Sequence, residues 1–213
     1  MIRAAAAFIF ALGLSAQTVT FTKEFPGSKP AYTFVSVSKN GALEYKESLT
    51  DDQPVKAQMS ADETASLFDM ASKLNFFKDS LESGLKVART GKKTFRYEDG
   101  SGKISEAVFN YSLNPLAQQL LDRFENIAAS ERAYISLEET SRFDKLGVND
   151  ALAEIESLWL KKELAAPSQF VPLLNQVASH ESYMHLARDR AARLRDEFRA
   201  ASAAAKAAPA GAK

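Results

Sequence analysis

Residues 114–147 read NPLAQQLLDRFENIAASERAYISLEETSRFDKLG, and this stretch decides the fold. Asn114 is a good N-cap acceptor, and Pro115 follows at the first helical position, where proline is best tolerated. Apolar residues then recur at spacings of three and four, namely Leu116, Leu120, Leu121, Phe124, Ile127, Tyr134 and Ile135. Gly147, just after Lys145, is a typical C-terminal stop. We therefore predict one helix of roughly 50 Å, at about 1.5 Å per residue, that joins two halves of the chain.

The half that precedes this helix has the pattern of strands with one further helix. Alternating or β-branched segments predict strands at residues 17–24, 32–37, 42–47, 94–98 and 104–111. Asn40-Gly41 and the glycine-containing turn at 99–102 are hairpin signals, because their residues tolerate positive φ. Ser60 and Glu63 have the spacing of a capping box, which starts a helix with Leu67, Phe68, Ala71 and Leu74 on one stripe.

The order is thus hairpin, helix, hairpin, helix. We predict an α+β fold in which two ββα units form a four- or five-stranded antiparallel sheet with its helices on one face. This sheet domain is expected to occupy residues 17–129.

The half that follows is predicted to be helical, as a C-terminal helical hairpin or small bundle over residues 130–200. Asn149-Asp150 is expected to cap its first helix, Ser168 to start a short second one, and Glu181 to start the last. Beyond Ala200 the chain consists mostly of alanine with lysine, proline and glycine, so residues 201–213 are predicted to be a disordered tail.

The first sixteen residues have the three-part layout of a secretory signal peptide. Met1-Ile2-Arg3 is a positive leader, residues 4–14 are apolar, and the small Ser15 and Ala16 follow. The apolar run is too short to span a bilayer. We expect cleavage between Gly13 and Gln17, no lipid anchor since the junction has no cysteine, no transmembrane anchor after cleavage, and a periplasmic or secreted protein. The alternative is a buried N-terminal helix.

Composition limits the partners. Lysine plus arginine and aspartate plus glutamate both number 27, so no overall field draws the chain to nucleic acid. The sequence contains no cysteine, which excludes disulfides, thiolate nucleophiles and cysteine-bound metals.

No catalytic, cofactor-binding or metal-binding residue emerges from the motifs. His180 and His185 are five residues apart, about 140° around a helix, whereas the metalloprotease signature needs a spacing of four. Ser36 and Lys39 match the serine and lysine of penicillin-recognising enzymes, but they lie on a predicted β-hairpin and not at a helix start, and the partner motifs are missing.

Charge is unevenly distributed in the helical half. Acidic residues are in excess over residues 122–164 and basic residues over 182–213. The arginines of the last helix form a candidate interaction surface for an acidic partner, with Arg188, Arg190, Arg195 and Arg199 as its residues and Arg193 beside them. The alternative, which we favour, is internal pairing with Glu138, Glu139, Glu154 and Glu156, because only this also explains the acidic excess.

One segment resembles a known family. Gly27-Ser28-Lys29-Pro30-Ala31-Tyr32, followed by Asn40-Gly41 and Tyr45, resembles the opening of a bacterial envelope domain family of unknown function. That family has a Gly-x-Cys-Pro-x-Tyr segment, then an Asn-Gly or Asp-Gly hairpin and a tyrosine. Lys29 stands at the cysteine, so any role of that cysteine is lost here. The resemblance implies the α+β fold and an exported setting, and no activity.

Function is therefore expected to lie in surface contacts. We interpret the chain as a non-enzymatic envelope module that contacts another envelope protein or self-associates through its last helix. The competing hypothesis is a hydrolase whose site is built from scattered Asp, Glu, Ser and Lys.

Overall fold

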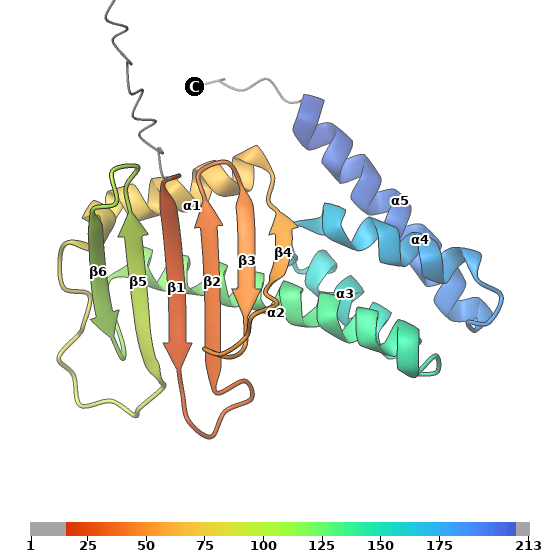
Figure 1. The fold of residues 1–213 in the computed structure, drawn as a ribbon, viewed down its shortest axis with the longest axis horizontal. Helices are drawn as coiled ribbons and strands as arrows, with labels where there is room; N and C mark the ends of the chain where they lie inside the picture. Colours follow the sequence, from red (N-terminus) through yellow and green to blue (C-terminus); the bar gives the residue numbers. More distant parts are fainter. Residues whose placement is uncertain (1–15, 208–213) are drawn as a thin grey trace, which may run out of the picture.

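A computed structural model describes residues 16–207, which form a six-stranded antiparallel sheet followed by a group of helices (Figure 1). The elements are β1 (Thr18–Glu24), β2 (Tyr32–Ser38), β3 (Ala42–Lys46), β4 (Val55–Gln58), α1 (Ala61–Lys73), η1 (Asn75–Phe77), β5 (Lys92–Glu98), β6 (Ile104–Phe109), α2 (Pro115–Phe143), α3 (Val148–Leu160), η2 (Pro167–Phe170), α4 (Val171–Ser179) and α5 (His185–Ala207). The predicted α+β class, an antiparallel sheet with C-terminal helices, is confirmed. Four strands precede α1 and two precede α2, where two ββα units were predicted. The predicted signal peptide, except Ala16, lies outside the described residues.

The sheet has the order β4-β3-β2-β1-β5-β6, so its first strand is central. Six strands replace the four or five predicted. The strand that was missed is β4, whose four residues, Val-Lys-Ala-Gln, are too short and mixed for a period-two pattern. It forms because β3 offers an open edge, against which Val55 lies opposite Tyr45 and Gln58 opposite Ala42.

Local signals place the element boundaries in the sheet half. Gly41 has a φ of 86°, and a Cβ built there would lie 2.7 Å from the carbonyl oxygen of Met59, so only glycine fits this turn. Ser60 and Glu63 form the predicted capping box of α1. The Asn114 side chain accepts from the amides of Leu116 and Ala117, which starts α2 as predicted.

Helix α2 is continuous, but it ends earlier than predicted. It stops at Phe143 instead of extending to Gly147, and the amide of Asp144 bonds back to the carbonyl of Thr140. Gly147 instead occupies the N-cap position of α3, without a side-chain cap bond. The predicted cap at Asn149-Asp150 is therefore wrong, and the Asn149 amide oxygen accepts a hydrogen bond from Arg190.

The last helix also differs from its predicted limits. It begins at His185 instead of Glu181 and continues to Ala207. The predicted tail at 201–213 is thus wrong for residues 201–207, where alanines favour helix even with little to pack against. Residues 208–213 lie outside the described part of the chain. Within that part, no helix has both the length and the apolar character needed to cross a membrane.

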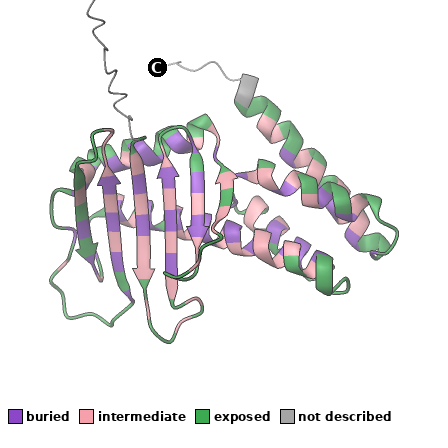
Figure 2. Ribbon diagram, in the orientation of Figure 1, coloured by how far each residue is buried: buried purple, intermediate pink, exposed green. Residues whose placement is uncertain are grey.

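Two apolar cores lie along α2. Figure 2 marks buried residues in purple on both the strands and the helices. The first joins α1 and the inner face of the sheet to the first half of α2, where Phe124 stacks on Phe21 with ring centroids 5.3 Å apart. The second joins Ala133 and Leu137 to α3, α4 and α5. Helix α2 therefore contributes to both cores.

A single charge buried in the second core should disrupt that core while the first core stays folded. Leu194 is fully buried on α5, and Leu194→Asp removes packing worth about 2–5 kcal/mol and adds a buried carboxylate. We expect trypsin to cleave rapidly between Arg188 and Arg199, while hydrogen exchange shows the sheet still protected. The exposed Ala200→Asp should behave like wild type. A lower mass in light scattering without new cleavage would instead identify the stripe as a self-association surface.

Candidate functional site

The arginines predicted as a surface point to different sides of α5. Arg190 and Arg193 face α3, where Glu156 pairs with both at 3.0 and 2.6 Å. Arg195 pairs with Asp196 at 2.8 Å and lies 3.5 Å from Asn175 of α4. Arg188 is half-buried and Arg199 is exposed.

The predicted acidic partners of these arginines are only partly used. Glu156 takes two of them, whereas Glu138 pairs with Arg142 of its own helix at 2.7 Å. The oppositely charged segments of the sequence therefore meet mainly in the ion pairs between α5 and Glu156 of α3. This leaves Arg188, Arg195 and Arg199 on another side of the helix, seven and four residues apart.

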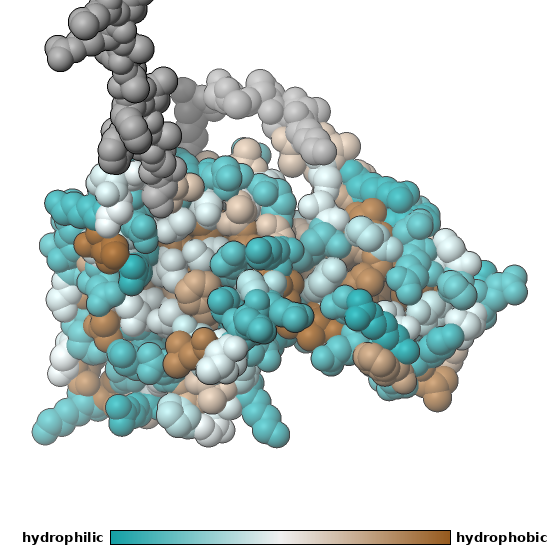
Figure 3. Space-filling model, viewed as in Figure 1, coloured by the Kyte–Doolittle hydropathy of each residue, from teal (hydrophilic) through white to brown (hydrophobic). Residues whose placement is uncertain are grey.

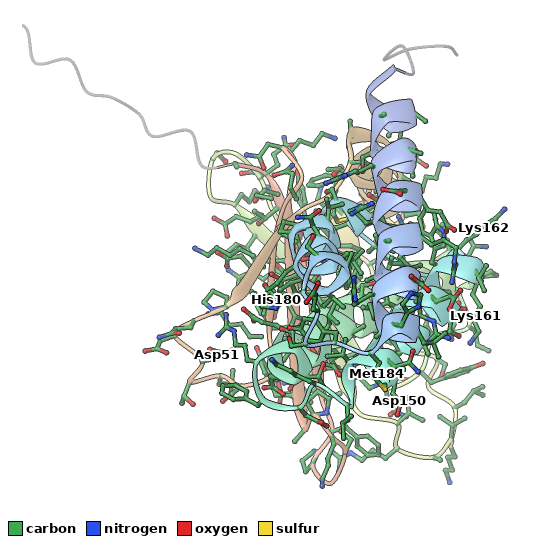
Figure 4. The ribbon with its side chains drawn as sticks, turned by 90° about the vertical axis from the view of Figure 1, so that its right-hand side faces the viewer. Asp51, Asp150, Lys161, Lys162, His180 and Met184 are labelled. Atoms are coloured by element: carbon green, nitrogen blue, oxygen red, sulfur yellow. The ribbon has the colours of Figure 1, made fainter. Side chains whose placement is uncertain are left out.

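The histidines do not form a site. His180 follows α4 at the turn into α5 (Figure 4), and His185 pairs with Asp189, one turn along α5, at 2.8 Å. Both histidines are exposed. Within residues 16–207, no three His, Cys, Asp or Glu side chains are grouped so that they could hold a metal ion.

A hollow lies on the sheet face opposite α1 and α2, the face turned to the viewer in Figure 3. It measures about 520 Å³ and spans β1, β2, β5 and β6. Its lining residues are Thr18, Thr20, Thr22, Tyr32, Phe34, Ser36, Lys92, Thr94, Arg96, Glu98, Glu106 and Val108. Among residues 16–207, α1 and α2 pack against the other face and no helix covers this one (Figure 1).

Strand alternation places these side chains in rows across the sheet. In one row Ser36, Thr20, Arg96 and Glu106 lie opposite one another on β2, β1, β5 and β6. The Thr20 hydroxyl donates to the Ser36 hydroxyl at 3.2 Å. The centre of the hollow is therefore a stripe of hydroxyl groups, each able to donate and accept hydrogen bonds.

Aromatic and charged groups surround this stripe. Tyr32 and Phe34 are two residues apart on β2 and so share the open face, and the Lys46 ammonium lies 5.8 Å from the Phe34 ring centre. Burial, and secondarily the Glu24 carboxylate, raise the pKa of Tyr32. Both signs of charge are present, so the face suits a ligand of mixed polarity better than a polyanion.

Sequence reasoning did not single out this face. Its signal was available in the alternation of Thr18, Thr20 and Thr22 with Val19 and Phe21. The pattern predicts a strand with one polar side, but not that this side stays uncovered. That depends on both helices packing against the opposite face.

Lys93 is a buried cation near the hollow, on the inner face of β5. Its ammonium donates to the Thr90 hydroxyl and to the Asn110 carbonyl, both at 2.8 Å. Burial, with a smaller contribution from Lys23, lowers its pKa. Since its donors are occupied by loop and strand oxygens, Lys93 anchors the end of β6 and is not presented to a ligand.

Glu131 is a buried acid at the boundary between the two cores. Its Oε1 accepts from the Gln169 amide at 2.8 Å, while Glu131 Oε2 and Gln169 Oε1 have no partner among the described residues. Burial raises the pKa of Glu131 to about 7, against the opposing effect of the Gln169 bond. When Glu131 is protonated, its O–H group can donate to the free Gln169 Oε1. The ionised carboxylate has no such donor. The group is fully buried and lies on α2, behind the sheet, so it is not a catalyst for the hollow.

No family model, curated protein or solved structure matches the chain. The resemblance of residues 27–45 to the envelope domain family therefore stays a prediction.

Glu131 should make stability depend on pH. Its pKa is raised from 4.5 to about 7 on folding, so the folded state holds the extra proton between these values. The free energy of unfolding should therefore fall as pH rises through this window and level off above it. Glu131→Gln keeps an acceptor for the Gln169 amide and adds an N–H donor for its free amide oxygen. It also removes this titration, and it should stabilise the protein at pH ~8 by about 1–3 kcal/mol.

Urea denaturation across the pH range measures this effect. Glu139→Gln changes an exposed carboxylate on the same helix and should keep the wild-type slope. A Glu131→Gln protein with that same slope would contradict the assignment.

Proposed function

We propose that the protein is an exported, non-enzymatic binding module whose open sheet face binds a polypeptide partner. The observation that carries the proposal is the hollow of about 520 Å³ over β1, β2, β5 and β6. One side of the sheet packs against the core, and the other presents hydroxyl and charged groups together with two aromatic rings and Val108.

The composition of the hollow favours a polypeptide. Hydroxyl groups offer both donors and acceptors, the rings of Tyr32 and Phe34 offer apolar contact, and Arg96 and Glu98 bring both charges. Protein interfaces combine these same features. A nucleic acid or other polyanion would need a positive excess, whereas lysine and arginine are matched here by two glutamates.

The proposal places the partner in the bacterial envelope. The leader Met1-Ile2-Arg3, the apolar run and the small residues at 15 and 16 support export. An exported binding module requires no catalytic residue, in agreement with the motifs of the sequence. Self-association through α5 is the competing use of the same fold.

Site-specific photo-crosslinking in cells of the source organism tests the binding face. A photoreactive residue replacing Thr20 or Thr94, in the hollow, should yield a discrete crosslinked protein. The same residue replacing Asp69, exposed on α1, should not. Equal products from all three positions, or none from the hollow, would overturn the assignment of the face.

Export should be visible in the mass of the mature protein. We expect intact mass spectrometry of the exported material to show an N-terminus between residues 14 and 17, because the signal peptide is removed after one of the small residues. Exported material that still begins at Met1, or a protein confined to the cytoplasm, would contradict it.

A further inference from the structure

Strand β6 ends the sheet, and the backbone groups on the outer side of Ile104, Glu106 and Val108 have no hydrogen-bond partner among the described residues. Each end strand contacts a short helix, β4 contacting η2 and β6 contacting η1, where the Ser105 hydroxyl donates to the Phe76 carbonyl at 2.6 Å. Among the described strands, β6 pairs only with β5. Its sequence, Ile-Ser-Glu-Ala-Val-Phe, contains none of the prolines or lysines that commonly protect an edge.

The hydrogen-bond pattern identifies the free backbone groups. The Asp99 amide donates to the Lys103 carbonyl, so residue 103 and every second residue after it face β5. Ile104, Glu106 and Val108 therefore direct their N–H and C=O groups off the sheet. The next position in this alternation is Asn110, whose amide donates to the Glu82 carboxylate at 2.6 Å. The edge is thus capped at one end and available along three residues.

The side chains of these three residues lie on the open face. Ile104 and Val108 are 46% and 45% exposed and flank Glu106. A second hollow of about 210 Å³ adjoins Val108, lined also by Glu82, Arg89, Lys92, Phe109 and Asn110. Because Val108 and Glu106 also line the large hollow, the edge continues the proposed binding face.

The charge of Glu106 favours a basic partner at this edge over a second copy of the chain. Glu106 lies opposite Arg96 in the sheet register, but the Arg96 guanidinium is paired with Glu98 at 3.8 Å. Within residues 16–207, Glu106 forms no ion pair. A second copy of the chain, paired antiparallel over the full strand, would place its own Glu106 against this one, and like charges directly opposite are destabilising.

We propose that β6 receives an extended segment of another protein as a seventh strand. The segment has a lysine or arginine opposite Glu106 and apolar residues two positions to either side, opposite Ile104 and Val108. Main-chain hydrogen bonds to β6 provide the affinity for this strand, and the contacts of its alternate side chains provide the specificity. The inference rests on the proposed binding role and names the class of partner.

A synthetic peptide in which valine, lysine and valine alternate with threonine is the probe. Its pattern is the same in both chain directions, so strand polarity does not affect the test. Fluorescence anisotropy should show that it binds the protein, and that the matching peptide with glutamate for lysine binds about tenfold more weakly. Glu106→Lys should reverse this preference, whereas Glu44→Lys, on the interior strand β3, should leave it unchanged.

Val108→Pro tests the backbone bonds. The Val108 amide faces the open edge, so proline leaves the β5–β6 bonds in place and removes one edge donor. Both peptides should lose binding. If this variant does not fold, the reversal in Glu106→Lys decides by itself.

Binding of neither peptide to the wild type, or an equal effect of Glu44→Lys and Glu106→Lys, would overturn the proposal. So would a dimer in light scattering that Val108→Pro dissociates, because the edge would then bind a second copy. Crosslinks from Thr20 that persist in Glu106→Lys and Val108→Pro would retain the binding face while removing the edge from it.

Discussion

One helix has to be buried on two different surfaces, and the rest of the structure depends on this constraint. Helix α2 packs Phe124 and its neighbours against the sheet and Leu137 against the helical group. Between them it carries two buried polar residues: the Ser130 hydroxyl accepts from the Ala165 amide at 2.8 Å, and Glu131 binds Gln169. Polar bonds at this boundary define where the connecting segment docks, which apolar contacts alone would not do.

The same packing accounts for the surface that remains free. Both long helices of the sheet half lie on one face, so the inner side chains of the strands are buried and the outer ones stay in contact with solvent (Figure 2). Threonine suits this exposed side, because its β-branched side chain favours strands and its hydroxyl group remains hydrated. The open face therefore follows from the arrangement of the core.

Charged residues in the helical half form ion pairs with one another, within and between its helices. Glu156 holds two arginines of α5, and partly buried pairs of this kind orient a helix whose apolar stripe includes small alanines such as Ala187 and Ala191. On the sheet, by contrast, Glu106 has Arg96 opposite it in the register but no ion pair among the described residues. The carboxylate of Glu156 is thus paired within the α3–α5 contact, whereas the carboxylate of Glu106 has no such partner among the described residues.

The sequence by itself determined the features whose partners lie within a few residues. These include the Asn40-Gly41 turn, the capping box at Ser60, the start of α2 at Asn114 and the α+β class, because their hydrogen bonds and periodicities are local. Tertiary structure decided what depends on distant partners. Strand β4 forms only on the edge of β3, and β1 is central because β5 pairs with it across residues 92–98. Glu131 is buried beside Gln169, which lies 38 residues further along the chain and donates a hydrogen bond to it. The candidate site belongs to this second group. The alternation of its threonines is visible in the sequence, but their exposure depends on which face of the sheet the helices cover.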